Sequence, residues 1–275
     1  MLEALKVIIL GVVEGITEWL PISSTGHLIL VEEFVKLNLS DAFVQMFNVV
    51  IQLGAIMAVV VLYFHKLNPF SKTKTSKQQM LTVQLWIKVL IASVPAAIIG
   101  LLFNDIIEEK FMNSYVVAAT LIIYGILFIV IENRHKGVQP KITSLSKLTI
   151  PMVLIIGVFQ VLALIPGTSR SGATIVGALL IGTARGVAAE FTFFLAIPVM
   201  FGASLLKIIK FGFHFTGMEG IMLLLGCAVS FAVSIFAIKF LMQYIKNHDF
   251  KVFGYYRIIL GMIVFLYFGI SALIA

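Results

Sequence analysis

Two carboxylates interrupt an apolar stretch near the start of the chain. Glu14 and Glu18 lie four residues apart within residues 4–22, so in a helix they share one face. Acidic side chains are costly inside apolar segments and are functional candidates there. Neighbouring carboxylates repel each other unless a cation or proton offsets their charge, and carboxylate oxygens suit Mg²⁺ or Ca²⁺. We therefore predict a divalent-cation site at Glu14 and Glu18; the alternative is two hydrated carboxylates at a helix end.

Two loops rich in Ser, Thr and Gly have the composition of anion sites. Each contains residues that cap a helix N-terminus, and the free N–H groups of such a terminus attract phosphate. Arg170 could clamp the same phosphate with two parallel hydrogen bonds. The alternative is a pair of ordinary capped loops, with Arg170 reaching lipid headgroups. The candidate phosphate-binding residues are Ser23, Ser24, Thr25 and Gly26 in the first loop, and Thr168, Ser169, Arg170, Ser171 and Gly172 in the second.

A histidine and two glutamines complete the set of candidate site residues. His27 follows Ser24 by three residues, so the two can share a helix face. This spacing fits a serine nucleophile with a histidine base, or a histidine that contacts phosphate directly. A structural, hydrogen-bonded histidine is the alternative. Gln52 and Gln160 lie inside apolar runs and could supply polar ligands to the same cavity, or bond a neighbouring helix.

The elements that position these residues are apolar helices. About 20 apolar residues suffice to cross a bilayer. Two stretches, 4–22 and 148–166, each end in one of the loops and are followed by a helix too short to cross. Six runs are long enough to cross, one of them marginally: Phe47–Phe64, Leu85–Phe103, Ser114–Ile131, Phe191–Leu206 (the marginal one), Ile221–Ile238 and Tyr255–Leu273.

Composition places the chain in a membrane. Of its 275 residues, 60% are hydrophobic and only 12% are charged, against about 25% charged in a soluble domain. The net charge of +7 would suggest a nucleic-acid partner in a soluble protein. Here the basic residues gather in loops between apolar runs, where the positive-inside rule accounts for them, so we expect no nucleic-acid partner. The single cysteine, Cys227, excludes an intramolecular disulfide and is expected to be a packing residue.

The two loop-bearing stretches look like copies of one another. Gly11 aligns with Gly157 and Gly26 with Gly172, both at a shift of 146 residues, and Ser24 then aligns with Arg170. Each stretch is followed by three apolar runs. We predict one all-α membrane domain, 1–275, made of repeats 1–145 and 146–275. If each loop re-enters the bilayer, three crossings per repeat invert the second repeat relative to the first.

Loop charges give the orientation. Segments 65–84 and 133–147 contain lysine or arginine and no acid, whereas 32–41 and 105–110 are mainly acidic. The first two should be cytoplasmic and the other two external. Charge does not separate re-entrant loops from loops that cross. Re-entry is preferred because Ala173–Gly182 is apolar and too short to span.

These motifs resemble a known family. Gly11-Val12-Val13-Glu14-Gly15-Ile16-Thr17-Glu18 with its following loop, and Pro166-Gly167-Thr168-Ser169-Arg170-Ser171-Gly172, resemble the two signatures of the bacterial undecaprenyl-diphosphate phosphatase family, also called the bacitracin-resistance family. The resemblance covers essentially the whole chain. It implies a multi-pass enzyme of the bacterial inner membrane that recycles the lipid carrier of cell-wall synthesis. Six crossing helices, two re-entrant pairs, an outward-facing site and a divalent cation are also implied.

Roles follow from the resemblance residue by residue. Glu14 and Glu18 would be the acidic pair, Ser24 the nucleophile, His27 its partner and Arg170 the phosphate-binding arginine. Direct water attack with His27 as base stays open. A transporter of polyprenyl phosphate is the alternative function, because inverted repeats with half-helices are also typical of transporters. The expected partners are a polyprenyl pyrophosphate and membrane lipids, with a homodimer left open.

Overall fold

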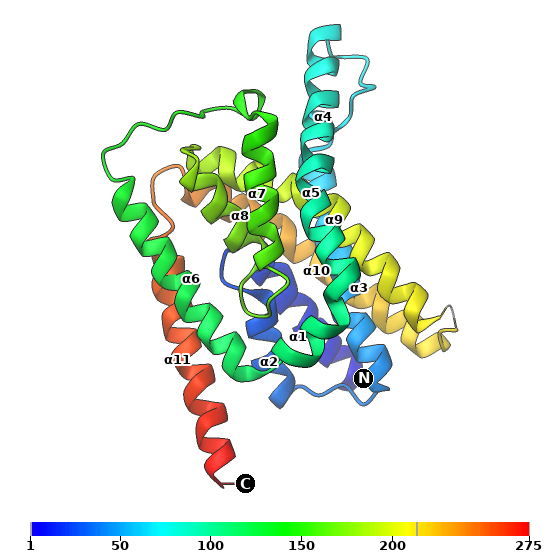
Figure 1. The fold of residues 1–275 in the computed structure, drawn as a ribbon. Helices are drawn as coiled ribbons and strands as arrows, with labels where there is room; N and C mark the ends of the chain where they lie inside the picture. The colour runs from blue at the N-terminus through cyan, green and yellow to red at the C-terminus, as the bar shows by residue number, and fades with distance from the viewer. Residues whose placement is uncertain (1, 213, 275) are drawn as a thin grey trace.

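The computed structural model describes residues 2–212 and 214–274, with side chains described except at 104, 108 and 272–274. This part of the chain is built from α-helices and one 3₁₀ turn, η1 (Leu145–Lys147), and it contains no β-strand. Figure 1 shows long helices arranged around a centre of shorter ones. The predicted all-α class is confirmed.

Six helices are long and apolar enough to cross a membrane, and each contains one of the predicted runs, except that the run 47–64 extends two residues beyond the end of its helix at Leu62. The marginal run 191–206 lies in a helix of 27 residues, because the helix continues into flanking positions that the apolar run did not include. The chain is therefore a multi-pass membrane protein. The six are α3 (Asp41–Leu62), α5 (Ser76–Phe111, apolar over 76–103), α6 (Ser114–Arg134), α9 (Arg185–Phe211), α10 (Gly217–Tyr244) and α11 (Lys251–Ile274).

Four shorter helices form two matching pairs. The first pair is α1 (Leu2–Thr17) and α2 (Ser24–Phe34), and the second is α7 (Ile150–Leu162) and α8 (Arg170–Leu180). Ser23 caps α2 at φ 74°, and Ser169 caps α8 at φ 69°. Each serine side chain accepts a hydrogen bond from the backbone N–H three residues later, at Gly26 and Gly172. The same uncommon left-handed cap thus recurs 146 residues along the chain.

Each first helix of a pair packs against the opposite half of the chain. Helix α1 contacts α10, α7 contacts α5, and α6 lies against α11. Close approach explains the glycines: a Cβ at Gly15 would lie 2.8 Å from the Ser230 carbonyl oxygen, and one at Gly157 only 2.3 Å from that of Ala92. The two halves therefore interlock, and the loops between the short helices lie at the centre of the fold (Figure 1).

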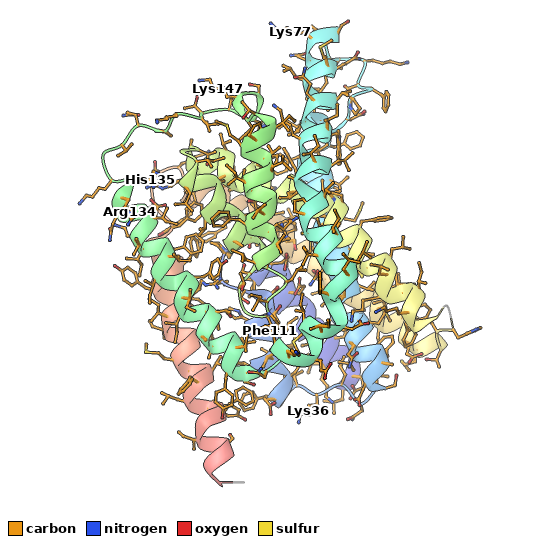
Figure 2. The ribbon with its side chains drawn as sticks, in the orientation of Figure 1. Lys36, Lys77, Phe111, Arg134, His135 and Lys147 are labelled. Carbon is orange, nitrogen blue, oxygen red and sulfur yellow. The ribbon has the colours of Figure 1, made fainter. Side chains whose placement is uncertain are left out.

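The segments that connect the helices lie at two opposite ends of the molecule, and polar contacts show which segments share an end. The chain start joins segment 32–41, since Lys6 Nζ donates to the Lys36 carbonyl and Glu3 accepts from the Asn38 N–H. Lys210 pairs with Asp105 at 3.2 Å. At the other end, Phe250 N–H donates to a carboxylate oxygen of Glu132. In Figure 2 Lys77 and Lys147 mark this second end and Lys36 the first.

Candidate functional site

Glu18 joins the two loops through both oxygens of its carboxylate. Oε2 accepts a hydrogen bond of 2.8 Å from the Ser24 hydroxyl, and Oε1 accepts one of 2.8 Å from Arg170 Nη2. Glu18 lies just after α1 and Ser24 begins α2, whereas Arg170 begins α8. The three predicted residues are thus brought together from both halves of the sequence.

Arg170 keeps part of its hydrogen-bonding capacity unused. Its Nη1 donates to the Thr192 carbonyl at 3.0 Å, and its guanidinium lies 5.8 Å from the centre of the Trp19 ring. The buried Nε has no hydrogen-bond partner in the part of the chain that the structure describes. Because a buried N–H without a partner is costly, this donor is suited to an anionic oxygen of a ligand.

Glu14 is fully buried one turn before Glu18, and neither of its carboxylate oxygens has a hydrogen-bond partner among the described residues. Gln160, at the equivalent position of the second pair, is also buried with both polar atoms unpartnered. Buried polar groups are nearly always satisfied in native proteins. Both positions therefore suit a bound group, and Glu14 suits a cation.

The remaining loop residues hold the two loops against each other. Ser171 Oγ donates to the Glu18 carbonyl at 3.1 Å, and it lies 3.1 Å from Ser169 Oγ. Thr168 is buried and Thr25 is half-buried. Gly26 and Gly172 donate their N–H groups to the capping serines. These residues keep two helix N-termini, α2 and α8, beside the Glu18 carboxylate.

His27 lies in the site region but turns to different partners from those predicted. Its Nδ1 is 2.7 Å from the Ser23 carbonyl oxygen, and its Nε2 is 2.7 Å from the Tyr256 hydroxyl. Facing a carbonyl, Nδ1 carries the proton, so in the neutral ring Nε2 accepts from Tyr256. The two rings also stack, with centroids 5.6 Å apart. Ser24 instead bonds Glu18, and no bond joins Ser24 to His27 in the described chain.

Gln52 stands apart from this network. It is half-buried on α3, and none of the described hydrogen bonds connects it to the loops. The structure therefore brings Glu14, Glu18, Ser24 and Arg170 into one centre, with His27 beside it.

Sequence reasoning missed Arg257, which is fully buried on α11. Its Nη2 donates to the carbonyls of Gly167 and Thr168, both at 2.9 Å, and its Nη1 donates to that of Pro21 at 3.3 Å. One guanidinium thus holds a carbonyl of the first loop and two of the second. The sequence did offer a sign of this role, because Arg257 is a lone cation inside the apolar run 255–273. A charged side chain inside a membrane segment is costly in free energy and usually has a function.

Two carboxylates are the protein ligands on offer for a divalent cation. Among the described residues no group of three or more His, Cys, Asp or Glu side chains gathers as for a closed metal site. Mg²⁺ commonly uses one or two carboxylates and takes its other ligands from water and substrate phosphate. The unpartnered oxygens of Glu14 fit this pattern, whereas both oxygens of Glu18 already accept hydrogen bonds from Ser24 and Arg170.

Comparison with known proteins agrees with the motifs. The chain is 66% identical over 268 residues to the undecaprenyl-diphosphatase of Acetivibrio thermocellus, with 98% of each chain covered. It is 60% identical over 275 residues to that of Desulfitobacterium hafniense, covering 100% of this chain and 99% of the relative. A family model described as bacitracin resistance protein BacA matches residues 7–263. The chain belongs to this BacA family.

Proposed function

We propose that the chain removes the terminal phosphate from undecaprenyl pyrophosphate, giving undecaprenyl phosphate and inorganic phosphate. The relatives named undecaprenyl-diphosphatase support the activity. The observation that carries it is the contact of Glu18 with both Ser24 and Arg170, which sets a hydroxyl, a base and a phosphate-binding cation side by side.

Arg170 and the N-termini of α2 and α8 bind the terminal phosphoryl group, whose charge they offset as it transfers. Ser24 attacks the phosphorus while its proton passes to Glu18, the carboxylate that already accepts its hydrogen bond at 2.8 Å. The bond from phosphorus to the bridging oxygen breaks, and undecaprenyl phosphate leaves. Water then attacks the phosphoserine, releasing inorganic phosphate and restoring the serine hydroxyl. Direct attack by water on the pyrophosphate is the competing path.

Glu14 and Glu18 would hold a divalent cation, which would supply positive charge to the leaving phosphate. Glu14 is the better placed of the two, since its oxygens have no other partner whereas those of Glu18 bind Ser24 and Arg170. His27, bonded to Ser23 and Tyr256, fixes the start of α2.

The proposed location is the bacterial inner membrane, with the site open toward the outer face. The acid-free basic segments 65–84 and 133–147 support a cytoplasmic position for the end marked by Lys77 and Lys147 in Figure 2. One chain supplies Glu14, Glu18, Ser24 and Arg170, so the proposed reaction requires no second copy.

The test is release of inorganic phosphate by the purified protein in detergent. A micelle has no second compartment, so hydrolysis there separates an enzyme from a transporter. We expect phosphate release from undecaprenyl pyrophosphate and none from undecaprenyl phosphate, the matched control. Substrate that stays intact with folded protein and added Mg²⁺ would reject the phosphatase and favour transport.

A further inference from the structure

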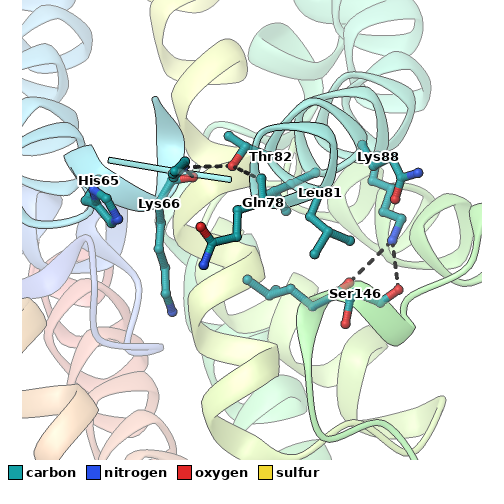
Figure 3. A pocket seen from close by; sticks show the side chains of 11 residues that line it. His65, Lys66, Gln78, Leu81, Thr82, Lys88 and Ser146 are labelled. Atoms are coloured by element: carbon teal, nitrogen blue, oxygen red, sulfur yellow. Dashed lines mark hydrogen bonds between the residues drawn. The ribbon is translucent and has the colours of Figure 1, made fainter. Parts of the chain in front are cut away.

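A basic cavity of about 320 Å³ lies away from the two loops. Its walls are α4 (Phe64–Leu67), the first turns of α5 and the 3₁₀ turn η1, as Figure 3 shows. None of its lining residues is acidic, and none belongs to the site described above. They are His65, Lys66, Lys74, Gln78, Leu81, Thr82, Gln84, Leu85, Lys88, Leu145 and Ser146.

Two of its three lysines have no counter-charge. Lys66 is paired with Glu190. Lys74 Nζ donates to the carbonyls of Lys66 and Asn68 and to the Thr82 hydroxyl, all of them neutral. Lys88 Nζ donates only to the carbonyls of Leu145 and Ser146, at 3.4 and 3.1 Å. In the described chain no carboxylate pairs with Lys74 or Lys88, so the cavity carries uncompensated positive charge.

The position of Lys88 along α5 indicates what kind of anion the cavity would bind. Lys88 lies three residues after the start of the apolar run 85–103 of α5, at the end of that run that adjoins segment 65–84. Leu81, in the cavity wall, and Ile87, on the same helix, are 41% and 48% exposed, so an apolar surface borders the charge. A cation at this depth favours an anion that is itself held in the membrane.

We propose that this cavity binds the phosphate of an anionic lipid headgroup from the cytoplasmic leaflet. Nine of its eleven lining residues come from the acid-free basic stretches 65–84 and 133–147, which the positive-inside rule places in the cytoplasm, and Leu85 and Lys88 directly follow the first stretch. Basic pockets between membrane helices on that side are suited to such headgroups. Leu81 and Leu85 contact the first carbons of the lipid, which favours a lipid phosphate over a soluble one.

The test compares lipids on the purified full chain by native mass spectrometry. We expect phosphatidylglycerol to be retained about tenfold more than zwitterionic phosphatidylcholine. Each of the two uncompensated cations should raise the affinity for an anionic lipid roughly fivefold, and screening by salt should reduce their combined effect to about tenfold. No preference between these lipids would overturn the proposal. Displacement of phosphatidylglycerol by an equal concentration of inorganic phosphate would identify a soluble-anion site and overturn the lipid assignment.

Paired variants place the binding in the cavity. Lys74→Met with Lys88→Met should abolish the preference, and Lys74→Arg with Lys88→Arg should keep it. The matched control, Lys72→Met with Lys77→Met, removes the same charge from exposed positions of the same segment and should change retention less than about twofold. Undecaprenyl pyrophosphate hydrolysis, which uses none of these residues, reports folding. Equal losses in the cavity pair and the control pair would overturn the proposal.

Discussion

The Glu18 carboxylate accepts a hydrogen bond with each of its oxygens, one from a hydroxyl and one from a guanidinium. Removal of Ser24 would cost this buried carboxylate one hydrogen bond, and removal of Arg170 would also take away the charge that compensates it. Substitutions can nevertheless distinguish the proposed role of each side chain in phosphoryl transfer.

Arg170→Ala should lower the rate of phosphate release by roughly 10²–10⁴-fold, because a lost transition-state contact of about 3–5 kcal/mol has that effect. Arg170→Lys should recover little, since an ammonium cannot replace a planar fork that contacts Glu18 and Thr192 and that would bind the phosphate at the same time. Steady-state assays of folded protein in detergent check this. Near-wild-type turnover in Arg170→Lys would show that charge alone suffices.

Ser24→Ala separates the two chemical paths. If Ser24 Oγ forms the bond to phosphorus, its removal should eliminate turnover while substrate binding persists. Single-turnover assays with a parallel binding measurement test this, and Ser23→Ala, which removes a cap and not the nucleophile, is the control. Retention of more than about a tenth of the wild-type rate would favour water attack, with Ser24 as a phosphate ligand.

Glu14→Gln should raise the Mg²⁺ concentration required for half-maximal activity, because an amide is a weaker ligand than a carboxylate for a hard cation. Excess chelator should abolish activity in the wild-type protein, and Mg²⁺ or Ca²⁺ should restore it. A titration of activity against free metal measures both effects. Full activity in chelator would remove the proposed cation from Glu14 and Glu18.

At the scale of elements, two short helix pairs meet through their loops and are held by α11. Arg257 donates to Pro21 in the first loop and to Gly167 and Thr168 in the second. Arg257 thus fixes the N-termini of α2 and α8 relative to each other, as the proposed phosphate binding by both would require.

Arg257→Met should lower both stability and activity, because it leaves several buried carbonyls without donors at about 1–3 kcal/mol each. Phosphate release should fall at least about tenfold even at temperatures where the variant stays folded, since the loops lose their common anchor. Thermal unfolding and activity are measured on the same sample. Arg134→Met, at the exposed end of α6, is the control and should change neither. A stability loss with full activity below the unfolding temperature would limit Arg257 to folding.

The sequence predicted most of these elements because apolar runs of about 20 residues have few alternatives in a membrane. The repeat also predicted that the two loops, with Ser24 and Arg170, meet at one site, whereas Glu18 was predicted there as a cation ligand and not as the partner of both residues. The sequence did not predict the partner of Ser24, because a spacing of three residues to His27 says nothing of where Glu18 lies after α1 ends. The left-handed φ of Ser23 and Ser169 was equally hidden, since serine rarely adopts it.

At the scale of the whole molecule, we propose that repeats 1–145 and 146–275 are inverted with re-entrant loops. Three contacts support this over loops that cross. Re-entry places the chain start on the same side of the membrane as 32–41, residue 210 on the same side as 105, and residue 250 on the same side as 132. In the structure a hydrogen bond or ion pair joins the two members of each pair. Crossing loops would separate all three pairs by the thickness of the membrane. In Figure 1 the chain start and the end of α11 also lie away from the end that carries α4.

This topology predicts that both termini are external. Leu2→Cys in a Cys227→Ala background should react with a membrane-impermeant thiol reagent in intact cells, since position 2 is exposed and Cys227 is the only native thiol. Lys77→Cys in the same background is the matched control and should react only after the membrane is permeabilised, because 65–84 is the acid-free segment that the positive-inside rule retains in the cytoplasm. The measurement is labelling with and without permeabilisation, on protein that still releases phosphate. Labelling of position 2 only after permeabilisation would place the chain start inside and refute re-entry of the first loop.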